Sequence, residues 1–177
     1  VNKLAFYDPL TQLPNRRLMV DRLNQALGIS ARSGRMGALQ FIDLDNFKTL
    51  NDTQGHAMGD LLLQQVAQRL SQCLRDGDTV ARLGGDEFVV MVEELSEIRE
   101  EAAALAEKIG EKILATISQP YRLGGLEYQI TPSIGITLYA DRPVSVGDYC
   151  RFGDKAGTIE HIGMRSTRIR TPERTVI

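Results

Sequence analysis

The sequence predicts an α/β (α+β) protein in which helices flank a mixed β-sheet. Segments with helical periodicity alternate with short apolar runs of β-forming residues, the pattern of helices packed on a sheet. Two of the runs are joined by only two glycines and an acid, which is typical of a β-hairpin. Of 177 residues, 42% are hydrophobic and 25% charged, so the chain has room for one domain with a core, or for a domain plus a small appendage.

The individual elements can be justified in chain order. Residues 11–27 have Pro14 near their start and then apolar side chains along one helical face. Residues 37–47 form an apolar run that ends in acids, as expected of a buried strand whose C-terminal end reaches a site. In the next helix, 59–74, Asp60 lies where an acid favours a helix start. The remaining elements are strands 79–83 and 87–92, helix 96–117, and strands 121–131 and 133–140.

After Ala140 the sequence changes to short alternating runs separated by glycines, which predicts an all-β segment. We therefore expect two domains, 1–140 and 141–177, with the boundary near Arg142–Pro143. No run is as long as a membrane span, and the first residues lack the features of a signal peptide. A cytoplasmic location is expected, either alone or as the cytoplasmic part of a larger membrane-associated protein.

The net charge of −2 gives no general field that would attract nucleic acid or anionic lipid. A nucleic acid polymer is therefore not expected as a partner, and neither is a membrane within this segment. Any anionic ligand must be held by local groups.

The acids of "FIDLDNFK" are the first candidates for such a site. Strand alternation places Asp43 and Asp45 on the same side of the strand, so either could serve a ligand. A hard cation such as magnesium prefers a few carboxylate or carbonyl oxygens, and Asp86 in the hairpin turn could join Asp43 if the two strands are neighbours. Gly84 and Gly85 would let the backbone approach a bulky ligand closely.

Each of these residues also has an ordinary structural explanation. Two glycines and two acids are common turn chemistry, and strand-end acids are often simply solvated. Asp60 could cap a helix within a polar connection, Lys48 could be solvated, and His56 could be a loop hydrogen-bonding group.

Four motifs taken together favour function. They are "DPLTQLPNRR", "FIDLDNFKTLNDTQGHAMGD", "RDGDTVARLGGDEFVVMV" and "SIGITLY". In this order and spacing, from about Ala5 to Tyr139, the chain resembles the GGDEF family of diguanylate cyclases. The resemblance implies a nucleotidyl-cyclase-like scaffold that condenses two GTP molecules into cyclic di-GMP with release of pyrophosphate. It also implies Mg²⁺, with Mn²⁺ as the alternative, and a homodimer during turnover, since two GTP-loaded sites must face each other.

The resemblance assigns roles to the acidic residues and one lysine. It makes Asp43 a metal ligand through its carboxylate and Leu44 one through its carbonyl. Asp86 would be the third ligand and the base for the ribose 3′-hydroxyl. Lys48 would stabilise the phosphoryl transition state, and Glu87 would have a supporting role.

The resemblance also implies a substrate site. The backbone around Asn46, Phe47 and Lys48 would cradle phosphates. Asn51 and Asp60 match the guanine-reading positions, and His56 matches a nearby substrate contact. An Asp oxygen can accept from the adjacent N–H donors of guanine, which adenine lacks.

The motif "RDGD" has the spacing of the family's product-inhibition site. Arg75 would grip a phosphate and stack on guanine, while Asp78 would accept from guanine N–H groups. A charged turn leading into the hairpin is the alternative.

The sequence departs from the family pattern in two places. Gln12 replaces a glycine that is usual in the first motif. After Tyr139 the family's final helix, with its phosphate-contacting lysine, and its final strand are lacking. Residues 143–177 instead resemble the β-domain of small-conductance mechanosensitive channels, a short SH3-like β segment. Three hypotheses stay open: an active cyclase, an impaired module that binds GTP or cyclic di-GMP as a sensor, and a structural role led by the tail.

Overall fold

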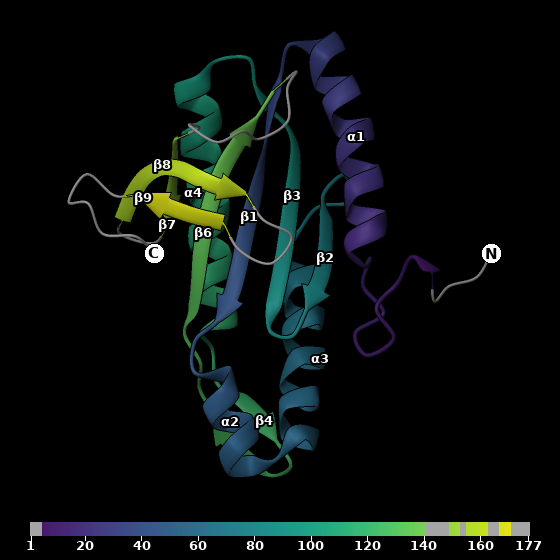
Figure 1. The fold of residues 1–177 in the computed structure, drawn as a ribbon, viewed down its shortest axis with the longest axis vertical. Helices are drawn as coiled ribbons and strands as arrows, with labels where there is room; N and C mark the ends of the chain where they lie inside the picture. Colours follow the sequence, from purple (N-terminus) through teal and green to yellow (C-terminus); the bar gives the residue numbers. More distant parts are fainter. Residues whose placement is uncertain (1–4, 141–148, 153–154, 163–166, 171–177) are drawn as a thin grey trace.

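The computed structural model describes residues 5–140, 149–152, 155–162 and 167–170. Figure 1 shows one sheet with helices on both faces. The helices are α1 (Arg16–Ser33), α2 (Phe47–Gln54), α3 (His56–Cys73) and α4 (Arg99–Ile117). The strands are β1 (Met36–Leu44), β2 (Thr79–Gly84), β3 (Glu87–Ser96), β4 (Tyr121–Leu123), β5 (Leu126–Tyr128), β6 (Pro132–Tyr139), β7 (Tyr149–Phe152), β8 (Lys155–Ile162) and β9 (Thr167–Arg170).

The main sheet has the order β2-β3-β1-β6-β7-β8-β9. The α+β class with flanking helices is confirmed, but every described pairing is antiparallel, whereas the sequence predicted a mixed sheet. The reason is that the helical connections join strands of the same direction that are not neighbours. β3 lies between β1 and β2, and β1 lies between β3 and β6. This is a split β-α-β arrangement.

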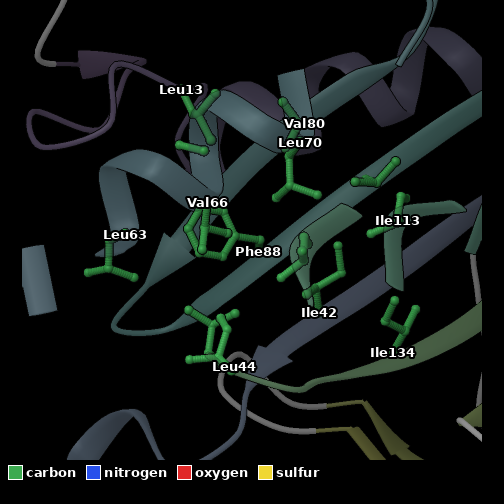
Figure 2. Close-up of a cluster of buried hydrophobic side chains, with 14 of the residues drawn as sticks. Leu13, Ile42, Leu44, Leu63, Val66, Leu70, Val80, Phe88, Ile113 and Ile134 are labelled. Atoms are coloured by element: carbon green, nitrogen blue, oxygen red, sulfur yellow. The ribbon is translucent and has the colours of Figure 1, made fainter. Parts of the chain in front are cut away.

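Strand alternation assigns the side chains of the sheet to two hydrophobic layers. Along β1, Ile42 and Leu44 belong to the larger cluster, which packs on α3 and α4, whereas Leu39 belongs to the smaller cluster beneath α1. Figure 2 shows the larger cluster, in which Val66 of α3 and Phe88 of β3 are at most 1% exposed. Full burial of each such side chain stabilises the fold by about 1.5–3 kcal/mol.

Helix α1 begins later than the sequence predicted. Asn15 caps it, accepting a hydrogen bond from the Leu18 amide at 3.1 Å, and Gly34 ends it with a left-handed φ of 74°. The residues before Asn15 form a loop rather than a first helical turn.

Two further segments differ from the prediction. Helix α2 was not predicted, and its second half lies in the segment 51–60, for which a polar connection was one alternative; Leu50 is its one fully buried residue. The predicted strand 121–131 is instead the small separate hairpin β4–β5, because Gly124 and Gly125 both adopt positive φ and turn the chain.

Strands β7, β8 and β9 continue the main sheet outward from β6. The predicted boundary near Arg142–Pro143 lies outside the described residues. The prediction of a separate β-domain therefore stays a prediction. Among the described helices, none is both long and apolar enough to cross a membrane.

Candidate functional site

Two neighbouring strands bring the predicted acidic pair together. Asp43, the next-to-last residue of β1, lies directly opposite Glu87, the first residue of β3. The carboxyl group of Asp43 lies within hydrogen-bonding reach of that of Asp86, which precedes β3. Desolvation of its carboxyl group, the hydrogen bond and charge of Asp86, and the charges of Glu87 and Asp45 raise the pKa of Asp43 from 3.8 to about 7. A bound cation would relieve this crowding of negative charge.

Asp45 has a different role from Asp43. The Ser133 hydroxyl donates to the Asp45 carboxylate at 2.8 Å, and the Asp45 amide donates to the Thr131 carbonyl at 3.1 Å. Asp45 thus ties the end of β1 to the start of β6. Of the two acids that the sequence left open, Asp43 is the one that contacts Asp86.

The turn that carries Asp86 has an open, unusual backbone. Gly84 and Gly85 adopt φ values of 143° and 51°, which side-chain-bearing residues rarely adopt. A Cβ atom at either position would meet no atom within 4 Å. The glycines are therefore required for the turn conformation, and the turn leaves free space beside it.

An ion pair that the sequence analysis missed holds this turn. Arg82 donates to the Gly85 carbonyl at 3.0 and 2.8 Å and to the Asp8 carboxylate at 3.0 and 3.1 Å. Burial acts to raise the pKa of Asp8, but the hydrogen bonds from Thr11 and Arg82 outweigh this effect and lower the pKa. Asp8 of the first motif thus holds the turn in place. Since Asp8 and Arg82 are 74 positions apart, the sequence alone does not reveal this link.

The N-terminus of α2 follows directly after β1. Asn46 enters the helix with a left-handed φ of 59°, a conformation that asparagine tolerates better than most residues. Since the first amides of an α-helix have no partner within the helix, those of Phe47 and Lys48 remain available to an anion. The Lys48 side chain is exposed and makes no hydrogen bond or ion pair with the described residues.

Asn51 of α2 lies against the first turn of α3. A Cβ atom on Gly59 would lie 1.9 Å from Asn51 Oδ1, so a side chain at this position would displace Asn51 or α3. This amide oxygen is buried and has no hydrogen-bond partner among the described residues. Asp60, the next residue of α3, and His56, its first, are both exposed. Gly59 was missed because its role depends on how α2 packs on α3.

The "RDGD" motif forms a turn before β2. Arg75 pairs with Asp78 at 3.3 Å and donates to the Glu93 carbonyl of β3. The Arg75 side chain is 59% exposed, whereas the Asp78 side chain is 4% exposed. In this arrangement Asp78 is occupied by Arg75, which is itself accessible from solvent.

The donor set at Asp43 fits a magnesium ion. Mg²⁺ is usually bound by one or two carboxylates and completes its shell with water and substrate phosphates. Asp43 and Asp86 supply such a pair. The described residues contain no group of three or more His, Cys, Asp or Glu that could hold a metal, so a closed structural metal site is not present there.

Comparisons with known proteins match the part of the chain that contains this site. The family described as "Diguanylate cyclase, GGDEF domain" matches residues 5–158, which extends beyond Tyr139 into β8. The bifunctional diguanylate cyclase/cyclic di-GMP phosphodiesterase MucR of Pseudomonas aeruginosa is 50% identical over 137 residues, 77% of this chain. The chain spans 19% of the length of MucR.

Two solved structures are also similar. The GGDEF domain of TpbB from Pseudomonas aeruginosa has a TM-score of 0.72 at 42% identity, covering 77% of this chain and 79% of that chain. The GGDEF domain of DgcB from Caulobacter crescentus, in complex with c-di-GMP, has a TM-score of 0.69 at 28% identity, covering 80% and 81%. Since the family match covers most of the sequence, this chain belongs to the diguanylate cyclase GGDEF-domain family.

Proposed function

We propose that this chain is a diguanylate cyclase domain that condenses two GTP molecules into cyclic di-GMP and releases pyrophosphate. The observation that carries the proposal is the contact between the Asp43 and Asp86 carboxyl groups, next to the free amides at the start of α2. A pair of acids beside a phosphate cradle suits phosphoryl transfer, which needs charge neutralisation and positioning more than covalent chemistry.

The metal site would consist of the Asp43 and Asp86 carboxylates and the Leu44 carbonyl. A Mg²⁺ ion held there would supply charge neutralisation at the α-phosphate. Glu87, opposite Asp43, would support the geometry of the pair.

In the reaction, the 3′-oxygen of one GTP bonds to the α-phosphorus of the other, and the bond from that phosphorus to the bridging oxygen of pyrophosphate breaks. Asp86 accepts the proton of the 3′-hydroxyl. Lys48 and the amides of Asn46, Phe47 and Lys48 stabilise charge on the phosphates. A second, equivalent transfer closes the ring, so turnover requires two protomers with their sites facing each other.

Guanine recognition would lie between α2 and α3. The buried Asn51 oxygen has no partner among the described residues, and leaving such an acceptor unpaired costs about 1–3 kcal/mol. A guanine N–H group would satisfy it, while the Asp60 carboxylate would accept the neighbouring N–H groups. His56 would contact the nucleotide from the start of α3, and Gly84 and Gly85 would leave room for it.

A sensor that binds the product without turnover is the second candidate. It is favoured by the accessible Arg75 paired with Asp78, because a guanidinium and a carboxylate together can bind the phosphate and guanine of cyclic di-GMP. In an active cyclase the same pair would serve product inhibition.

The tail is a further part of the proposal. We propose a β appendage of the kind found beside mechanosensitive channel pores for the tail, of which the structure describes β7, β8 and β9. The antiparallel strands β7, β8 and β9 support a β-rich tail. Replacing the tail by a family-type final helix and strand should raise turnover by about one to two decades, because a charged phosphate contact is regained. Equal rates would contradict this reading of the tail.

The experiment is to incubate the purified chain with GTP and Mg²⁺ and to separate the products by chromatography, with ATP as the control substrate. Cyclic di-GMP from GTP, with no product from ATP, supports the cyclase. Binding of added cyclic di-GMP without any turnover selects the sensor instead.

A further inference from the structure

A second open space borders the catalytic turn. It is a cleft of about 580 Å³ lined by residues of the 7–9 segment, the first turns of α1 and the 82–84 segment. Gly84 belongs to this lining and also to the turn that carries Asp86. The cleft is therefore adjacent to the catalytic acids, although none of the proposed nucleotide contacts of α2 and α3 lies in it.

The cleft and the acids share one face of the sheet. Strand alternation places Asp43 on the same side of β1 as Leu39 and Phe41, which pack in the cluster beneath α1. By the same rule Glu87 lies on the side of Val89 in that cluster. The Arg82 amide in β2 donates to the Pro14 carbonyl just before α1 at 3.0 Å, while Figure 1 shows α2 below the tip of β1. The catalytic turn thus lies between the α2–α3 side and the cleft.

Three arginines line the cleft, and two of them are already engaged. Arg82 holds Asp8 and the Gly85 carbonyl. The Arg17 guanidinium lies over the Phe6 ring, 4.9 Å from its centre. Arg16, which is half-buried, makes no hydrogen bond, ion pair or ring contact with the residues that the structure describes. It is the cation of the cleft that remains available to a ligand.

We propose that Arg16 binds a phosphate of the GTP carried by the second protomer. This inference rests on the proposed function. The chain's own nucleotide would be held by Asn51, Asp60 and the start of α2, on the far side of the turn from α1. Since the reaction joins two nucleotides, the partner's nucleotide must reach the free flank of the same turn. A guanidinium is well suited to binding a phosphate there.

The test compares wild type with Arg16→Gln, Arg16→Lys and Arg17→Gln. Turnover of GTP is measured in Mg²⁺, and binding of a non-hydrolysable GTP analogue is measured at a protein concentration where light scattering shows a monomer. Arg16→Gln should lower turnover about 10- to 100-fold, the loss expected for one charged contact, and leave analogue affinity within about twofold. Arg16→Lys should retain part of the rate, and Arg17→Gln should keep most of it.

Two results would overturn the inference while leaving the proposed function intact. One is wild-type turnover in Arg16→Gln. The other is an equal loss of analogue affinity in that variant, which would make Arg16 a contact of its own protomer's nucleotide. Thermal melting of each variant separates either result from a loss of fold. A wild-type chain without turnover would overturn the proposed function, and this inference with it.

Discussion

The carboxyl group of Asp43 lies within hydrogen-bonding reach of that of Asp86 across the ends of two neighbouring strands. Two acids that approach this closely repel each other once both are ionised. Desolvation and the neighbouring acids raise the pKa of Asp43 to about 7, which reflects the free-energy cost of ionising this carboxyl group in the fold.

Asp43→Asn should therefore stabilise the metal-free chain at pH 8. A carboxyl group whose pKa is raised in the fold binds its proton more tightly there than in the unfolded chain, so stability falls as the pH rises from about 4 to 7. Because Asp43 is only partly desolvated and solvent screens its charge, the gain should be only about 1 kcal/mol at pH 8 and close to zero at pH 4.

The measurement is urea unfolding of both chains in a chelator at the two pH values. The same substitution should abolish Mg²⁺-dependent turnover. If the stability difference between wild type and Asp43→Asn is the same at pH 4 and pH 8, ionisation of Asp43 beside Asp86 does not destabilise the fold.

Gly59→Ala should disturb the proposed guanine site. The added methyl group would lie 1.9 Å from Asn51 Oδ1, so either the Asn51 side chain or α3 must move. We expect a loss of about 1–3 kcal/mol in unfolding free energy, the usual cost of overpacking, and at least a tenfold weaker affinity for GTP. Gly28→Ala is the matched control, because this helical glycine has no neighbouring atom closer than 3.7 Å to the added Cβ. Normal GTP affinity in Gly59→Ala would rule out this placement of Asn51.

Gln12→Gly should stabilise the fold. Gln12 adopts a φ of 59°, a left-handed conformation that costs a residue with a side chain about 1–2 kcal/mol, and glycine removes that cost. Part of the gain is offset by the greater freedom of glycine in the unfolded chain, which leaves about 0.5–1 kcal/mol in denaturant unfolding. Both variants lose the exposed hydrogen bond from the Gln12 side chain to the Pro9 carbonyl, but Gln12→Ala also keeps the strain, so it should not stabilise. Equal stability of the two variants would show that the strain is negligible.

Arg75→Ala should relieve inhibition by cyclic di-GMP without changing the initial rate. The Arg75 side chain is mostly exposed and lies in the "RDGD" turn, away from the contact between Asp43 and Asp86. The readout is the initial rate of GTP turnover against added cyclic di-GMP, and we expect the inhibition constant to rise at least tenfold. Asp76→Ala, a change at an exposed position of the same turn, is the control. Unchanged inhibition in Arg75→Ala would reduce this motif to a charged turn.

The sequence predicted those parts of the fold and site that depend on local pattern. The strand before Asp43, the hairpin around Gly84 and Gly85, and the meeting of Asp43 with Asp86 all follow from periodicity, turn chemistry and the family motifs. The antiparallel order of the sheet did not follow, because a helical connection does not reveal which strand lies between the two that it joins.

The missed features depend on contacts between distant or weakly patterned segments. Helix α2 has one fully buried residue, so it carries little apolar periodicity. The ion pair of Asp8 with Arg82 joins segments 74 residues apart, and each residue alone is an ordinary surface charge. The requirement for Gly59 arises only once α2 and α3 are packed together.

The most direct test of the central claim is turnover of GTP by wild type and Asp86→Ala, measured side by side in Mg²⁺ together with their unfolding free energies. Asp86 lies in a turn outside both hydrophobic clusters, so the substitution should leave stability within about 1 kcal/mol of wild type. If Asp86 binds the metal and accepts the 3′-hydroxyl proton, cyclic di-GMP formation should be lost in the variant and present in wild type. Wild-type turnover in a folded Asp86→Ala chain would contradict the account.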